Sequence, residues 1–195
     1  MGTGEQRMNM KLNNQGHSSA VMAMLLLVAA VLACSSMGDE TEKANKLVNE
    51  GNAAVQEAKK YVTDAEEKKQ TMLQTKVAQL AEARALAKEV IAAYDKAEDK
   101  CKEAAKKYEE ASKLKIKDKF KEYLALKVKE YNKRAEIVET AKGLPQGLLD
   151  SESRASFISR VNATNEKVDQ LTKEADDIGA QADELQKDNP DSFKS

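Results

Sequence analysis

Apolar residues spaced alternately three and four positions apart run through most of this chain, and this spacing constrains its fold more than any other feature. From residue 80 the pattern continues without a fault for ten positions: Leu80, Ala83, Ala87, Val90, Tyr94, Ala97, Cys101, Ala104, Tyr108 and Ala111. Such spacing places the side chains on one face of an α-helix, as a seam that must pack against another helix. Because most of them are alanines, the sequence predicts helices that approach closely and bury modest apolar area per residue.

Three further seams have the same spacing. They comprise Ala44, Val48, Gly51, Val55, Ala58, Val62 and Ala65; then Phe120, Leu124, Val128, Tyr131, Ala135 and Val138; and finally Phe157, Val161, Thr164, Val168, Leu171, Ala175, Ile178, Ala182 and Leu185. We therefore expect four helices, near residues 41–69, 72–111, 118–142 and 152–187. A long first helix followed by two shorter ones is the alternative, because no glycine or proline lies between Gly51 and Gly143.

Three interruptions set the expected boundaries between these helices. The first seam loses its register at Lys69, so a turn is expected between residues 66 and 76, with a heptad stutter inside one helix as the alternative. Residues 112–119 break the second seam. Gly143 looks like a helix C-cap and Pro145 follows it, so residues 144–149 are expected to form a loop. Asn189 and Pro190 should end the last helix.

The composition supports a helical fold. The chain of 195 residues has no tryptophan, 4% aromatic and 33% charged residues, which is typical of long helices and coiled coils. The predicted fold class is all-α: an elongated antiparallel helical bundle, coiled-coil-like, with three to four long helices. We divide the chain into a signal peptide (1–33), a tether (34–40), a single helical-bundle domain (41–187) and a tail (188–195).

One stretch, Ala20 to Ala33, is continuously apolar, and Arg7 and Lys11 precede it. A membrane-spanning helix needs about 20 apolar residues, whereas the apolar core of a secretory signal peptide has roughly 7–15. The 14 residues of this stretch therefore predict a leader that is removed on export.

The leader ends in Val31-Leu32-Ala33-Cys34, which resembles the lipobox of bacterial lipoproteins. The resemblance covers the leader and Cys34 alone. It implies that Cys34 becomes the first mature residue and carries a lipid that holds the protein to a membrane. Ser35 and Ser36 then imply sorting to the outer membrane, facing the periplasm. An ordinary secreted protein whose leader is simply cleaved is the alternative.

Residues with catalytic chemistry are scarce. The one histidine, His17, lies in the leader, and Cys101 has no histidine or second cysteine near it in the seam pattern. No phosphate-binding loop, nucleophile elbow or metal-ligand spacing is present. We expect no enzyme activity, no cofactor and no metal. Cys101 is either a redox or dimer-forming thiol or, as we favour, a small buried apolar residue.

A charge asymmetry provides the other candidate site. Residues 113–134 carry nine basic side chains and three acidic ones, and the first five basic residues are Lys113, Lys115, Lys117, Lys119 and Lys121. These lysines form a candidate patch for an anionic surface, such as phospholipid head groups or an envelope polymer. Alternatively, the last helix neutralises the basic stretch, because residues 152–191 carry ten acids and five bases. No groove-reading motif indicates nucleic acid.

Two functions are compatible with these features. The first is a non-enzymatic, lipid-anchored envelope protein that acts as a helical scaffold or spacer, attached to the membrane through Cys34 and holding an envelope protein or polymer. The second is a soluble periplasmic binding or chaperone-like module that cradles a client between helices. Alanine seams suit intramolecular packing and self-association equally.

Overall fold

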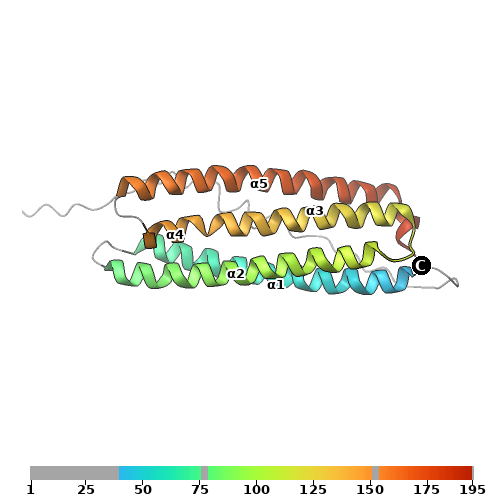
Figure 1. Ribbon diagram of the computed structural model, residues 1–195, viewed down its shortest axis with the longest axis horizontal. Coiled ribbons are helices and arrows are strands. Elements are labelled where there is room, and N and C mark those ends of the chain that lie inside the picture. The colour runs from blue at the N-terminus through green and yellow to red at the C-terminus, as the bar shows by residue number, and fades with distance from the viewer. Residues whose placement is uncertain (1–39, 76–78, 151–153, 195) are drawn as a thin grey trace, which may run out of the picture.

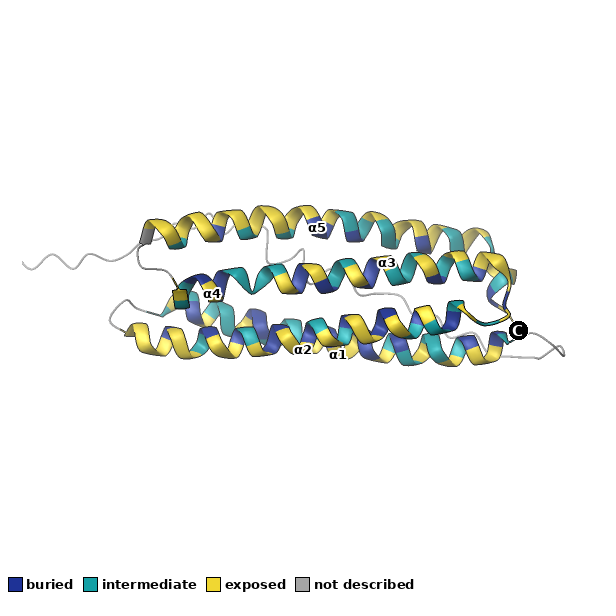
Figure 2. Cartoon of the chain, in the orientation of Figure 1, coloured by how far each residue is buried: buried dark blue, intermediate teal, exposed yellow. Residues whose placement is uncertain are grey.

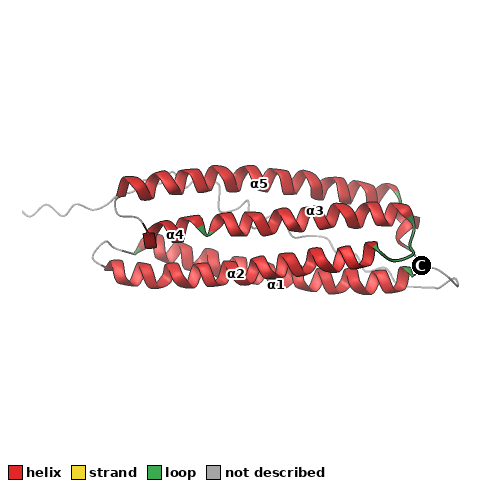
Figure 3. Cartoon of the chain, viewed as in Figure 1, coloured by secondary structure: helices red, strands yellow, loops and turns green. Residues whose placement is uncertain are grey.

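The structure is a computed structural model that describes residues 40–75, 79–150 and 154–194. It contains the α-helices α1 (Thr41–Gln74), α2 (Leu80–Ser112), α3 (Asp118–Ala141), α4 (Gly143–Asp150) and α5 (Arg154–Asp188), and the 3-10 turn η2 (Pro190–Phe193). The described residues form no strand (Figure 3). The protein is therefore an all-α helical bundle, as the seams predict.

The four long helices run alternately up and down a common axis (Figure 1). Neighbours follow the chain order: α1 packs on α2, α2 on α3, and α3 on α5, while α5 makes no extensive contact with α1 or α2. At about 1.5 Å per residue, the 33 residues of α2 give the bundle a length of about 50 Å. None of the described helices is long and apolar enough to cross a membrane.

The predicted seams form the core (Figure 2). All members of the seams at 44–65, 120–138 and 157–185 are buried or half-buried, and every member from Ala83 to Ala111 is buried. Leu80 is the exception with 44% exposure, because it is the first residue of α2, at the end of the bundle. The heptad pattern thus predicts the buried face of each helix correctly.

Small residues allow the first three helices to meet closely. Ala58, Cys101 and Ala135 form one core layer, with one residue each from α1, α2 and α3. A Cβ atom at Gly51 would lie 3.0 Å from the ring of Tyr108, whose hydroxyl donates a hydrogen bond to Asn52 Oδ1 at 2.7 Å. Gly51 therefore leaves the space into which the Tyr108 ring packs.

The helix boundaries expected near residues 69 and 72 are several residues too early, because α1 continues to Gln74 and α2 begins at Leu80. The ammonium of Lys69 donates a hydrogen bond to Glu66 Oε1 at 2.6 Å and lies 3.4 Å from the Tyr94 hydroxyl. A lysine on the packed face is thus accommodated without a break. The alternative of one helix from residue 41 to 111 is also wrong, since α1 and α2 are antiparallel neighbours.

The loop predicted for residues 144–149 is also wrong, because this segment forms α4. Pro145 is the third residue of α4, in the first turn, where a missing N–H removes no intrahelical hydrogen bond. The backbone N–H of Gln146 donates to the carbonyl of Lys142 at 3.0 Å, so helical hydrogen bonding resumes directly after α3.

The last helix ends at Asp188, as Asn189 and Pro190 predict, and the Asn189 side chain donates to the carbonyl of Leu185. The following residues were expected to form a tail. Within their described part, Phe193 is buried at 6% exposure, with its ring 5.0 Å from that of Phe120 and 5.2 Å from that of Tyr123. Residues 190–193 therefore belong to the core at this end of the bundle.

Candidate functional site

The five candidate lysines lie together at one end of the bundle, which we call the lysine end and define as residues 40, 113–121 and 190–194. It contains the connection between α2 and α3, the start of α1 and η2 (Figure 1, near the C label). Lys113, Lys115, Lys117 and Lys119 are exposed, and Lys121 is half-buried. The structure thus brings the predicted patch to a single surface that also includes the first described residue of the chain.

Lysines alternate with apolar residues in the segment between α2 and α3, and this alternation explains why the lysines are exposed. Residues 113–117 are outside any helix, and within them Leu114 and Ile116 turn inward to the core that contains Phe120. The lysines between them therefore point outward. At the same place the backbone N–H of Glu40 donates to the carbonyl of Lys115 at 3.0 Å, which ties the start of α1 to this connection.

Acidic and carbonyl groups neutralise part of the lysine end. Glu40 Oε2 accepts a hydrogen bond from the backbone N–H of Lys115, which lowers the pKa of this carboxyl. Lys117 Nζ donates to the backbone carbonyl of Asp191 at 2.6 Å, and Lys119 pairs with Glu122 at 2.7 Å. Further ion pairs join Lys113 to Glu109 and Lys194 to Asp191. The patch is therefore a surface of mixed charge, not a uniformly positive one.

Acidic residues of the last helix, α5, pair with basic residues of α3 that lie closer to the C-terminal end of α3 than the candidate patch does. Lys133 lies 3.1 Å from Glu174 and Arg134 lies 3.7 Å from Asp176, both on α5. Burial raises the pKa of Asp176, against the opposite effect of Arg134. The five lysines of the candidate patch form no ion pair with a carboxylate of α5 among the described residues.

Buried carboxylates occur at two places that the seam pattern does not reveal. Glu130 is 3% exposed, and its oxygens accept hydrogen bonds from Lys127 at 2.5 Å and from Arg134 at 2.7 and 2.9 Å. Glu66 accepts a hydrogen bond from the Tyr94 hydroxyl at 2.5 Å, and burial together with the Glu66 charge raises the pKa of Tyr94. Since their neighbours pair and orient both carboxylates, these groups act in packing.

Cys101 is buried in the layer with Ala58 and Ala135. Burial raises the pKa of its thiol to about 12, and the nearby Arg134 charge only partly offsets this effect. A thiol in this state is a poor nucleophile and a poor metal ligand. Among the described residues, no group of three or more histidines, cysteines or acidic residues could hold a metal ion. Cys34 lies outside the described residues.

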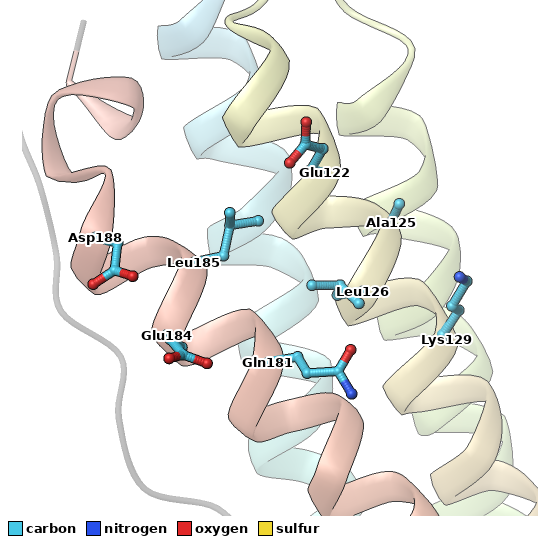
Figure 4. A pocket seen from close by; sticks show the side chains of 8 residues that line it. All are labelled: Glu122, Ala125, Leu126, Lys129, Gln181, Glu184, Leu185 and Asp188. Atoms are coloured by element: carbon cyan, nitrogen blue, oxygen red, sulfur yellow. The ribbon is translucent and has the colours of Figure 1, made fainter.

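A groove of about 570 Å³ opens between α3 and α5, and we call it the α3–α5 groove. Its lining residues are Glu122, Ala125, Leu126 and Lys129 from α3 and Gln181, Glu184, Leu185 and Asp188 from α5. Figure 4 shows that Leu126 points from α3 toward α5 and that Gln181 points from α5 toward α3. The seam pattern does not predict this groove. The signal for it was Leu126, an apolar residue that lies off the predicted seam of its helix.

Comparison with known proteins gave no relatives: no family model, no curated protein and no solved structure matches this chain. The candidate sites therefore rest on the residues and geometry described above.

Proposed function

We propose that this protein is a non-enzymatic, lipid-anchored envelope protein that acts as a helical scaffold or spacer. Its anchor is a lipid on Cys34, and its place is the outer membrane, facing the periplasm. The leader and the lipobox-like Val31-Leu32-Ala33-Cys34 motif support this proposal, as does the absence of histidine from residues 34–195.

The position of Glu40 is the observation that best supports the spacer function. Glu40 is held at the lysine end by hydrogen bonds in both directions with the backbone of Lys115. Five residues lie between it and Cys34, and a fully extended chain over these six Cα–Cα steps spans at most about 20 Å. A lipid on Cys34 would therefore keep the lysine end near the membrane, with the opposite end about 50 Å away.

The α3–α5 groove favours a second candidate function, a soluble periplasmic binding or chaperone-like module. Its volume of about 570 Å³ lies within the range of about 300–1,000 Å³ that is usual for ligand sites. Under this alternative the leader is cleaved near Cys34 without lipid attachment, and the client is held between α3 and α5.

Envelope fractionation of bacteria that express the full chain separates the two functions. For the anchored scaffold, we expect the wild-type protein in the membrane fraction and the Cys34→Ala variant in the soluble fraction. Metabolic labelling with a fatty-acid analogue should mark the wild-type protein but not the Cys34→Ala variant. The matched control is Cys101→Ala, which removes the other cysteine and should leave both results unchanged.

Two outcomes would contradict the anchor: membrane association that Cys34→Ala leaves intact, or a wild-type protein that is soluble and unlabelled. The second outcome, combined with protection of unfolded clients from aggregation, would favour the binding module.

A further inference from the structure

We propose that the α3–α5 groove docks a positively charged, amphipathic helical segment of a partner protein. This inference deepens the scaffold function, because it names the kind of partner that the scaffold holds, but it does not depend on the lipid anchor. It rests on the apolar floor of the groove, on the charges at its rim and on the open side of α5.

The floor of the groove is apolar and incompletely covered. Leu126 and Leu185 are half-buried and Ala125 is exposed, although all three residues line the same groove. Half-buried leucines beside an open volume gain from contact with further apolar atoms, at roughly 25 cal/mol for each Å² removed from water. The hollow is large enough for two or three apolar side chains of a partner.

The arrangement of the helices leaves room for an additional one. In the first three helices, seam residues of α1, α2 and α3 meet in shared layers, such as that of Ala58, Cys101 and Ala135. By contrast, α5 packs mainly against α3, with smaller contacts to α4 and η2, so no third long helix of the described residues packs extensively on α5. A partner helix in the groove would contact both, with anchors spaced three and four residues apart.

The rim of the groove carries three carboxylates and one ammonium group. Glu122 is paired with Lys119, whereas Glu184 and Asp188 form no ion pair within the described residues. These two carboxylates are four residues apart on α5, so they lie on the same face of that helix. Lysine or arginine side chains that flank the apolar anchors of a partner would satisfy them, and this complementarity defines the charge of the partner.

The basic stretch at residues 113–121 of a second copy of this chain is not the amphipathic partner segment that the groove requires. Its apolar residues Leu114 and Ile116 already pack in the core with Phe120, so they cannot serve as anchors without unfolding the lysine end. The occupant that the observations favour is therefore a segment of another protein.

Fluorescence anisotropy with the purified full-length protein in detergent tests this proposal. The probe is a labelled helical peptide of about 14 residues, with leucines at i, i+3, i+4 and i+7 and lysines on both flanks. Two further peptides replace its lysines with glutamates, or its leucines with serines. We expect the lysine–leucine peptide to bind and the other two to bind at least about tenfold more weakly.

Variants place the binding in the groove. We expect Glu184→Lys/Asp188→Lys to weaken binding of the lysine–leucine peptide about tenfold, since two attractions become repulsions. The matched control is Glu166→Lys/Asp169→Lys, which reverses two exposed charges on α5 outside the groove and should change the affinity less than about twofold. Leu126→Ser tests the apolar floor and should also weaken binding, while circular dichroism confirms that each variant folds.

Three results would overturn the proposal: equal affinity for the lysine and glutamate peptides, equal effects of the groove and control reversals, or an unchanged affinity in Leu126→Ser. A fourth result comes from sedimentation analysis of the oligomeric state. If the protein forms a dimer that Glu184→Lys/Asp188→Lys abolishes and that the peptide does not displace, the groove serves self-association instead. The fractionation of Cys34→Ala is independent of all these measurements, so failure of the anchor and failure of the groove are distinguishable.

Discussion

Glu130 is the most deeply buried charged residue in the described part of the chain, and its partners come from its own helix. Lys127 and Arg134 lie one turn to either side of it on α3, at three and four residues' distance. On α5 the facing residue is Gly179, where a Cβ atom would lie 3.3 Å from the Glu130 carboxyl. The glycine thus leaves space for the Glu130 carboxyl, whose hydrogen-bond donors both come from α3.

Removing this negative charge should destabilise the fold. In Glu130→Gln, the side chains of Lys127 and Arg134, each only 13% exposed, lose their ion pairs with Glu130, and breaking such a buried pair costs about 3 kcal/mol of the free energy of unfolding. Urea denaturation measures the change. The control is Glu122→Gln, which breaks an exposed pair with Lys119 on the same helix and should cost less than about 1 kcal/mol. Equal losses in the two variants would show that burial of Glu130 has no energetic consequence.

Cys101 should be inert in the native protein. At pH 8 a thiol with a pKa of about 12 has roughly a thousandfold less thiolate than an ordinary exposed cysteine. In Cys34→Ala, where Cys101 is the one remaining cysteine, we expect reaction with Ellman's reagent to be about a thousandfold slower in buffer than in denaturant. An exposed cysteine introduced as Gln56→Cys, with both native cysteines replaced, should react quickly in both conditions. Fast native labelling of Cys101 would revive its interpretation as a redox thiol.

At the scale of the helices, the sequence predicts their faces better than their ends. The faces follow from the three-and-four spacing, which depends on each helix alone, and the burial of the seams confirms them. The ends depend on tertiary partners that the spacing cannot reveal. In the sequence Lys69 indicates the end of a helix, but in the structure it contacts Glu66 and Tyr94 and the helix continues. Pro145 likewise indicates a loop, although it lies in the first turn of α4.

The candidate site was predictable to a similar, partial extent. The cluster of Lys113 to Lys121 follows from the sequence, and its placement at one end follows from the helix boundaries. The partners of Lys117 were not predictable, because they are backbone carbonyls of residues more than seventy positions away. The α3–α5 groove depends on how α5 is placed against α3, which the seams leave open.

The turn η2 should contribute to stability far more than a loose tail would. Phe193 is 6% exposed and contacts the rings of Phe120 and Tyr123, and truncation of a buried phenylalanine costs about 3–5 kcal/mol. We expect Phe193→Ala to lower the free energy of unfolding by about 3 kcal/mol, measured by urea denaturation. Lys194→Ala, an exposed neighbour, should have little effect. A Phe193→Ala variant as stable as the wild type would mean that η2 does not hold its place in solution.

For the whole molecule, ion pairs between helices should make the free energy of unfolding depend on pH in the acidic range. Lys142 at the end of α3 lies 2.8 Å from both Asp95 and Glu98 of α2, and it also pairs with Glu139. Burial favours the neutral form of Glu98, but hydrogen bonds from Lys102 and Lys142 outweigh it and lower its pKa to about 2. A carboxyl whose pKa is lowered by folding stabilises the protein above its ordinary pKa and loses this contribution as the pH falls toward 2.

Glu98→Gln should remove this part of the pH dependence. The amide imitates the protonated carboxyl, so we expect the midpoint of thermal unfolding to be about 3 °C lower than in the wild type at pH 7. The two midpoints should converge as the pH falls toward 2. Glu89→Gln changes an exposed carboxylate of α2 that has no ion pair within the described residues, and its curve should follow the wild type throughout. A constant difference between wild type and Glu98→Gln at every pH would contradict the assignment.

The bundle should stand on the membrane by its lysine end if Cys34 carries a lipid. Its ends are about 50 Å apart, and the tether from Cys34 reaches at most about 20 Å. With Cys101→Ala in the background, dyes attached to Lys115→Cys and to Gln146→Cys on α4 report the two ends in vesicles that contain an acceptor lipid. We expect strong energy transfer from position 115 and weak transfer from position 146. Equal transfer from both positions would mean that the bundle lies flat along the membrane, and a spacer function would then be excluded.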